Sequence, residues 1–210
     1  MTHSLLLSIE TAIIATICVF LIGLPLSYFF ARTSFKGKTV IETLFNLPLI
    51  LPPSVVGYLL LLFLGESGIG RFGIHWIFTW KAAVLAGAVV AFPLFFRTAK
   101  ASFESLDENI LDAARLDGSS YSIFYWVGLP LAKNGIIASV LLSFLRAVGE
   151  FGATLMVAGN IPGSTQTAPL AIYDHVLLGE EKAAMLLSLL LIIFSFILLS
   201  LSSFIAKKSA

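Results

Sequence analysis

Arg146 and Glu150 form the charged pair best placed to do chemistry in this sequence, because they lie four residues apart inside a long apolar stretch. Four-residue spacing puts two side chains on one face of a helix, where they can pair. A charge at the centre of a bilayer is costly, so such residues normally face the interior of a helix bundle. Three roles remain open: a structural ion pair, a positive lining that attracts an oxyanion, or a proton relay through Glu150.

The rest of the chain shows no pattern typical of a catalytic or metal centre. His3, His75 and His175 are scattered without the spacing of metal ligands, and no nucleophile stands beside a base. Gly37-Lys38-Thr39 resembles the end of a phosphate-binding loop, but Arg32 stands where that motif requires glycine. We therefore expect no metal, no cofactor, no ATP site and no enzyme activity in this chain by itself.

A polar insert runs from Glu108 to Pro130 between two apolar stretches. Its charged side chains must lie in water or against a soluble partner, because the bilayer core would penalise each of them. The spacing of apolar residues predicts a short helix that Gly118 ends, since glycine readily takes the left-handed conformation. A second short helix is expected to end at Leu129-Pro130. We interpret this pair of helices as a docking device.

Within the insert, the order Asp112-Ala113-Ala114-x3-Gly118-x10-Leu129-Pro130 resembles the cytoplasmic EAA loop of ABC importer permeases, E-A-A-x3-G-x9-I-x-L-P. Asp112 replaces the family's glutamate and keeps the carboxylate. The distance from Gly118 to Leu129 is one residue shorter than in the family, and Val127 lies nearest to the expected isoleucine. The resemblance implies that these residues dock a cytoplasmic ATPase, and we call residues 104–130 the coupling loop.

Two further blocks are similar to the molybdate/tungstate and sulfate permeases within that family. They are Leu47–Pro53 with Val56–Tyr58, and Gly149–Thr154 followed by Asn160–Gly163 and Pro169–Tyr173. Together with the coupling loop, the matches cover roughly residues 5 to 205 in the family's order.

Composition independently predicts an all-α polytopic membrane protein. Apolar residues make up 58% of the chain and the mean hydropathy is +0.98, and several apolar runs approach the ~20 residues that cross a bilayer as a helix. We expect one transmembrane domain over residues 1–210, with an external loop at about 159–182 whose part 169–178 dips into the membrane as a short helix. The five expected spans are Leu5–Ala31, Val40–Leu64, Ile77–Phe96, Gly135–Ala158 and Ala183–Ala206.

The second and third spans carry distinctive residues. Pro48, Pro52 and Pro53 interrupt the helical hydrogen bonds of the second span, either as a kink for packing or as a wall of a translocation path. We favour the path, because the polar Ser54 follows. In the third span, small residues recur every four positions, a pattern that lets helices approach closely; they are Ala83, Gly87 and Ala91.

Basic residues predict the orientation. With the coupling loop inside the cell, nine lysines and arginines lie on inner segments and three on outer segments, in agreement with the positive-inside rule. The inner ones are Arg32, Lys36, Lys38, Arg97, Lys100, Arg115, Lys133, Lys207 and Lys208, and the outer ones are Arg71, Lys81 and Lys182. The N-terminus is then outside and the C-terminus inside. The net charge of +1 argues against nucleic-acid binding.

The resemblance implies a subunit of a type I ABC importer that works by alternating access in the prokaryotic cytoplasmic membrane. Its implied partners are a second copy of the chain, two cytoplasmic ABC ATPases and an extracytoplasmic oxyanion-binding protein. The expected substrate is a tetrahedral oxyanion, molybdate or tungstate in preference to sulfate or another solute, and the expected path residues are Pro52, Pro53, Ser54, Arg146, Glu150 and Thr154. A proton-coupled secondary transporter that uses Glu150 is the alternative class.

Overall fold

Helices form the whole ordered framework of the described chain. The computed structural model describes residues 2–117 and 120–207. Its N-terminal half contains α1 (Thr2–Arg32), α2 (Lys38–Ile50), α3 (Pro53–Leu64), a 3₁₀ turn at Ile69–Phe72 and α4 (Trp80–Glu104). Its C-terminal half contains α5 (Glu108–Asp117), α6 (Ser120–Ile123), a π-helical turn at Phe124–Gly128, α7 (Leu129–Val148), α8 (Gly152–Ala158), α9 (Ala168–Leu177) and α10 (Glu181–Lys207).

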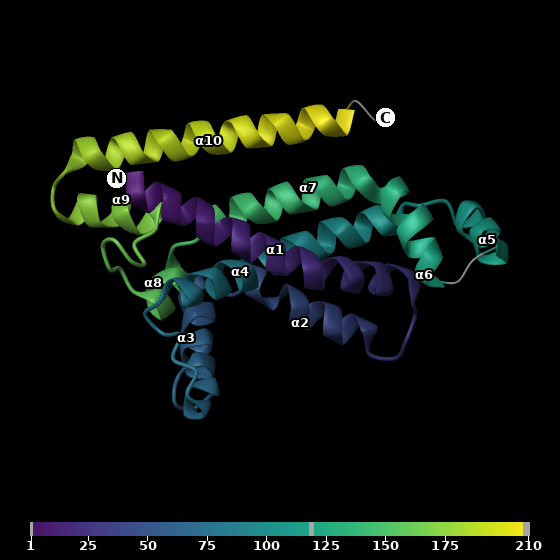
Figure 1. Cartoon of the computed structure of the whole chain (residues 1–210), viewed down its shortest axis with the longest axis horizontal. Coiled ribbons are helices and arrows are strands. Elements are labelled where there is room, and N and C mark those ends of the chain that lie inside the picture. Colours follow the sequence, from purple (N-terminus) through teal and green to yellow (C-terminus); the bar gives the residue numbers. More distant parts are fainter. Residues whose placement is uncertain (1, 118–119, 208–210) are drawn as a thin grey trace.

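Five segments of the described chain are long and apolar enough to cross a membrane, which confirms the predicted number of spans. They are Thr2–Arg32, Pro53–Phe72, Trp80–Glu104, Phe124–Val148 and Glu181–Leu201. α1, α4, α7 and α10 run along the long axis of the molecule (Figure 1). α5 and α6 lie at one end of this axis, whereas the N-terminus and α9 lie at the other end.

The small-residue face of α4 lies in the core of the bundle, as the sequence predicts. Ala83 and Ala91 are buried. A Cβ atom at Gly87 would lie 3.6 Å from the side chains of both Ala15 and Ala147, so α1 and α7 pack on this face from two sides. Close approach of the three backbones is possible because no larger side chain stands between them.

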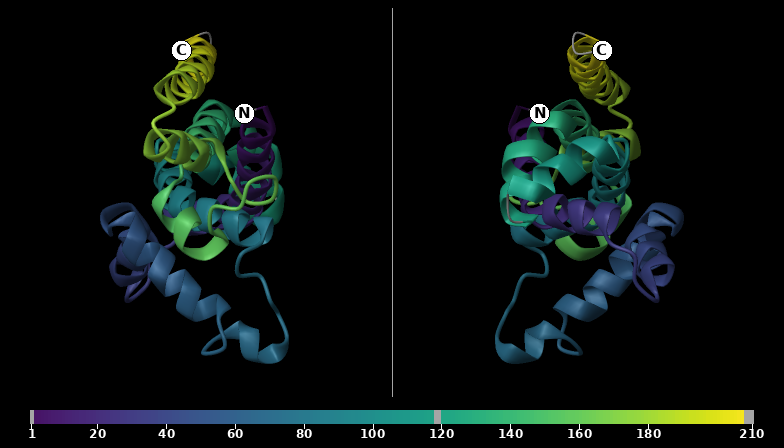
Figure 2. Two further views of the ribbon diagram at one scale, coloured as in Figure 1. Left: turned by 90° about the vertical axis from the view of Figure 1, so that its left-hand side faces the viewer. Right: turned by 90° about the vertical axis from the view of Figure 1, so that its right-hand side faces the viewer.

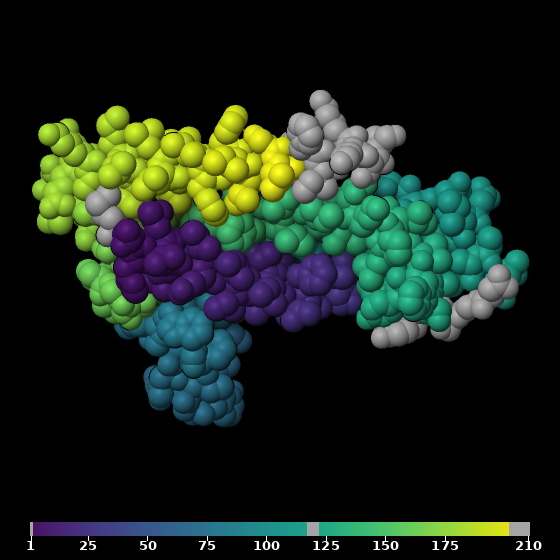
Figure 3. Space-filling view, turned by 45° about the horizontal axis from the view of Figure 1, so that its top comes forward, coloured from purple at the N-terminus to yellow at the C-terminus, as the bar shows by residue number. Residues whose placement is uncertain are grey.

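The predicted second span is two helices instead of one kinked helix. α2 ends at Ile50, and Leu51 and Pro52 are extended with ψ angles of 143° and 136°. Pro53 then occupies the first turn of α3, where its missing N–H costs no hydrogen bond. α3 projects sideways from the bundle (Figures 2 and 3) and packs on α8, since a Cβ at Gly57 would lie 2.7 Å from Met156 Cβ.

The predicted fourth span, Gly135–Ala158, is wrong at both ends. α7 ends at Val148, and a short break at residues 149–151 separates it from α8. At the other end, Leu129-Pro130 opens α7 instead of ending a helix of the coupling loop. Proline is compatible with the first turn of a helix, so the π-helical turn leads directly into α7. The third span also differs, because α4 starts at Trp80 and extends to Glu104.

Candidate functional site

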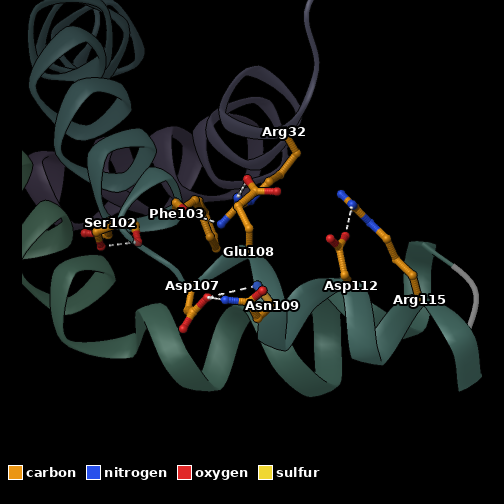
Figure 4. A network of polar contacts seen from close by, with 9 residues as sticks. Arg32, Ser102, Phe103, Asp107, Glu108, Asn109, Asp112 and Arg115 are labelled. Atoms are coloured by element: carbon orange, nitrogen blue, oxygen red, sulfur yellow. Dashed lines mark hydrogen bonds and ion pairs between the residues drawn. The ribbon is translucent and has the colours of Figure 1, made fainter.

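The coupling loop begins with a helix that its own sequence stabilises. The Asp107 carboxylate precedes α5 and accepts a hydrogen bond of 2.9 Å from the Asn109 backbone N–H, the contact of an N-cap residue. Glu108 places a negative charge in the first turn, which complements the helix dipole. α5 therefore forms over Glu108–Asp117, as the sequence predicts (Figure 4).

Arg32, at the end of α1, ties α5 to the bundle. Its Nη1 lies 3.1 Å from Glu108 Oε1, and its Nη2 donates to the carbonyl of Phe103 in the last turn of α4 (Figure 4). One guanidinium thus links α1 to both α4 and α5. The sequence shows Arg32 only as a basic residue at the end of a span, because its partners lie more than 70 positions away; its contact with the start of the polar insert was therefore missed.

An aromatic cluster ties the second part of the coupling loop to the same bundle. Tyr28 of α1 lies 5.2 Å from Phe103 of α4 and 4.7 Å from Phe124 of the π-helical turn, measured between ring centroids. Phe103 is buried and the other two rings are half-buried; aromatic pairs at such distances add stability beyond the area that they bury. Gly128 lets this turn approach, since a Cβ there would lie 3.2 Å from the Tyr28 ring.

The coupling loop exposes two large apolar side chains among its charged residues. Leu116 is 88% exposed and Trp126 is 82% exposed, the highest values among the large apolar side chains that the structure describes. Both belong to the end of the molecule that carries α5 and α6 (Figure 1). Leu116 lies outside the spanning segments, and Trp126 lies in the first turn of the segment Phe124–Val148. Exposed apolar side chains of this size, set among charged residues, are typical of protein-interaction surfaces.

The EAA-like residues are placed on and beside this surface. Ala113 is exposed and Ala114 is half-buried, while the Asp112 carboxylate lies 2.5 Å from Arg115 Nη1 on the exposed side of α5. Leu129 and Pro130 begin α7. Gly118, the predicted end of the first helix, lies outside the described residues.

Arg146 and Glu150 form the ion pair that their spacing predicts, although the helix between them ends. Arg146 Nη1 lies 2.8 Å from Glu150 Oε2, and the Glu150 side chain is only 2% exposed. The other oxygen, Oε1, accepts a hydrogen bond of 2.9 Å from the Ala153 N–H in the first turn of α8. Glu150 thus joins the end of α7 to the start of α8, and both of its oxygens are engaged.

The other expected path residues lie in two environments. Thr154 is buried and lines, with Glu150 and Thr167, a polar cavity of about 10 Å³, which is enough space for roughly one water molecule. Pro52, Pro53 and Ser54 are exposed. The start of α8, which precedes Thr154, packs against the start of α3, because a Cβ at Gly152 would lie 2.9 Å from Pro53 Cβ.

A second charged cluster escaped the sequence interpretation. Lys100 Nζ of α4 lies 2.7 Å from Glu42 Oε1 of α2 and 3.3 Å from Glu104 Oε1. The Lys100–Glu104 spacing is a visible signal for a pair, but nothing in the sequence shows that α2 lies beside α4. Among the described residues, no group of His, Cys, Asp and Glu is arranged to hold a metal ion.

Comparison with known proteins agrees with this architecture. Residues 23–209 match the family described as binding-protein-dependent transport system inner membrane component. YvgM, a permease protein of Bacillus subtilis, is 44% identical over 200 residues, which cover 92% of this chain and 88% of that protein. The molybdenum transport system permease protein ModB of Haemophilus influenzae is 40% identical over 210 residues, covering 96% of this chain and 92% of ModB.

The fold is also found in solved structures. An inward-facing structure of the MetNI methionine ABC transporter superposes with a TM-score of 0.80 at 16% identity, covering all of this chain and 95% of the matched chain. At that identity the likeness concerns the fold, which is the architecture of type I ABC importer permeases. The family match extends over most of the chain and includes the coupling loop, the broken second span and the Glu150 region. The chain therefore belongs to the family of inner membrane components of binding-protein-dependent transport systems.

Proposed function

We propose that this chain is the membrane-spanning half of an ATP-driven importer that moves a tetrahedral oxyanion, molybdate or tungstate, by alternating access. The observation that carries the proposal is the coupling loop. It exposes Leu116 and Trp126, and it is attached to the bundle twice, through Arg32 and through the Tyr28 cluster. A partner that pulls on this surface would move α1, α4 and α7 together, as a switch between two packed states requires.

The proposed partners follow from this arrangement. The coupling loop binds a cytoplasmic ATPase through Leu116 and Trp126, with Asp112, Ala113, Ala114 and Gly118 in the contact. Two copies of the chain enclose one path on a two-fold axis, and each copy binds one ATPase. ATP hydrolysis belongs to the ATPase and not to this chain. An extracytoplasmic binding protein delivers the oxyanion at the opposite end, near α9.

The substrate class is proposed from the relatives, since several of them are molybdenum transport permeases. Sulfate or another solute is the alternative within the same class. A proton-coupled transporter that uses Glu150 is less well supported, because both oxygens of that carboxylate are engaged by Arg146 and the Ala153 N–H. A structural pair is therefore the role that we assign to Arg146 and Glu150.

The test is uptake into sealed vesicles that contain this chain, its ATPase and the binding protein, with molybdate, tungstate and sulfate compared with and without ATP. We expect ATP-dependent uptake of molybdate and tungstate in preference to sulfate. Leu116→Glu should abolish co-purification of the ATPase and uptake together, whereas the matched change Leu178→Glu, at the other end of the molecule, should leave co-purification intact. Uptake that follows a proton gradient without ATP would overturn the proposal.

A further inference from the structure

One face of α4 carries four polar side chains near the end of the helix. Six of its residues recur at helical spacing and, with Leu49 of α2, line an open groove of about 590 Å³; they are Leu94, Arg97, Thr98, Ala101, Ser102 and Ser105. Three of these side chains carry hydroxyl groups and one is a permanent cation. Arg97 follows directly on the apolar run of α4 that ends at Phe96, so this face continues from the spanning part of the helix toward the end that carries the coupling loop. A charged side chain at this depth faces water or protein in preference to lipid.

Arg97 is the unneutralised charge of this groove. Its side chain is exposed, and none of the residues that the structure describes forms a hydrogen bond or ion pair with it. Lys100, one turn further along α4, has its charge neutralised, because its Nζ lies 2.7 Å from Glu42 Oε1 and 3.3 Å from Glu104 Oε1. These two carboxylates are therefore occupied, and the groove keeps a net positive charge at Arg97.

The hydroxyl groups are arranged along the same face. Ser102 Oγ donates to the Thr98 carbonyl at 3.1 Å, and Ser105 Oγ donates to the Ser102 carbonyl at 2.9 Å. A hydroxyl rotates freely about its C–O bond, so it can exchange such a contact for a donor directed into the groove. The face therefore offers rotatable donors one and two turns beyond Arg97.

We propose that this groove is the cytoplasmic half of the anion path and that Arg97 is the residue that attracts the oxyanion into it. The inference rests on the proposed function and names the residues of its path. A guanidinium presents several N–H donors in a planar fork suited to tetrahedral oxyanions. One arginine from each copy, with hydroxyls that are bonded to their own helix at rest, gives binding weak enough for the anion to leave again.

The test is the charge preference of a thiol placed in the groove. Ala101→Cys is made in the assembled complex after Cys18, the chain's own exposed cysteine, is changed to alanine. Its modification by an anionic and by a cationic methanethiosulfonate is timed with and without ATP. We expect Ala101→Cys to be modified from water in at least one nucleotide state. We also expect Arg97→Gln to lower the anionic-to-cationic rate ratio about fivefold, and Arg97→Lys to preserve the ratio.

Control variants distinguish a water-filled groove beside Arg97 from a face that is covered by lipid or protein. Ile193→Cys lies on the exposed apolar part of α10 and should resist both reagents. If Ala101→Cys resists them in every nucleotide state, the face is covered by lipid or protein and the proposal fails. A rate ratio that Arg97→Gln leaves unchanged also overturns it, because Arg97 would then be an anchor at the membrane boundary.

Uptake supplies a second readout. Arg97→Gln should reduce ATP-dependent molybdate uptake about tenfold, as expected for loss of a charged contact of ~1.4 kcal/mol, while the ATPase still co-purifies. Lys133→Gln removes another exposed cation, on α7, and should leave uptake unchanged. Equal uptake by Arg97→Gln and the unmodified complex would contradict the role of Arg97. If the unmodified complex takes up no oxyanion, the proposed function fails, whereas the thiol measurement still decides whether the groove is aqueous and positive.

Discussion

Glu150 uses each of its two carboxylate oxygens for a different structural purpose. Oε2 neutralises Arg146, and Oε1 caps the first turn of α8. The side chain is almost fully buried, whereas Arg146 is 30% exposed. Removal of a partner from a buried pair is far more damaging than removal of both charges, because it leaves an uncompensated charge in the interior.

We therefore predict unequal effects of two substitutions on stability. Arg146→Ala should destabilise the detergent-solubilised complex by about 3 kcal/mol, since it leaves Glu150 buried without a counter-ion. Glu150→Gln should cost only about 1 kcal/mol, because the glutamine Oε1 can still accept from the Ala153 N–H. Thermal unfolding midpoints of the two variants measure the difference.

The double variant Arg146→Ala/Glu150→Gln is the control, and it should recover most of the stability that Arg146→Ala loses. Equal losses from both single substitutions would contradict the structural pair. Glu150→Gln should also retain ATP-dependent uptake, and complete loss of uptake in a stably folded variant would restore the proton-relay role.

The sequence predicts this pair from its four-residue spacing, but it does not predict the break inside it. Spacing of that kind implies a continuous helix, while the chain turns at residues 149–151. Gly149 carries no side chain to hold the helix, and the Glu150 carboxylate favours a new helical start at Gly152. Both contacts depend on which groups are free nearby in three dimensions, and a single sequence does not contain that information.

Among the helices, α4 and α7 cross at very close range at Gly135. A Cβ at Gly135 would lie 1.6 Å from Ser102 Oγ and 2.5 Å from Ser102 Cβ. The near contact includes the first atom of the serine side chain, so rotation of the hydroxyl cannot relieve it. Gly135 therefore fixes the distance between the helix that follows the coupling loop and the helix that carries the Arg97 groove.

We predict that Gly135→Ala destabilises the protein by about 1–3 kcal/mol, the usual cost of overpacking. The measurement is again the thermal unfolding midpoint of the complex. Gly149→Ala is the matched control, because a Cβ there would have only one neighbour, at 3.6 Å. Ser102→Gly combined with Gly135→Ala should recover part of the loss, and a fully stable Gly135→Ala would contradict the close crossing.

The sequence predicts a helix correctly where the residues of that helix themselves determine where it begins and ends. The residues of α5 give both the amphipathic period and an acidic first turn, and the helix forms as predicted. The prediction is wrong where the boundary depends on another element, as at Leu129-Pro130. A proline there is compatible with the end of one helix or with the first turn of the next, and the contact of Gly128 with Tyr28 favours the second.

At the scale of the whole molecule, the two ends of the bundle differ in chemistry. One end carries the coupling loop, and the other carries the N-terminus and α9 (Figure 1). The basic residues are concentrated toward the first end, which is the basis for placing it in the cytoplasm. The number of spans was predictable from apolar length alone, whereas the sideways projection of α3 was not, because nothing local distinguishes it from a straight span.

We predict that a thiol at position 3 faces the outside of the cell and a thiol at position 36 faces the inside. His3→Cys and Lys36→Cys both lie at exposed positions and are made after Cys18→Ala. A membrane-impermeant maleimide should label His3→Cys in intact cells. Lys36→Cys should be labelled only after the cells are lysed, and the reverse pattern would invert the proposed topology.

The coupling loop continues into α7 as helix, through the π-helical turn Phe124–Gly128, and this connection has a mechanical consequence. The segment Phe124–Val148 contains 25 consecutive helical residues, a π-helical turn followed by α7, which at about 1.5 Å per residue form a rod of roughly 37 Å. Such a rod acts as a lever: a rotation of about 10° at the end that joins the coupling loop would move the far end, next to Glu150, through roughly 6 Å. A small displacement of the proposed ATPase would therefore be magnified at the far end of α7.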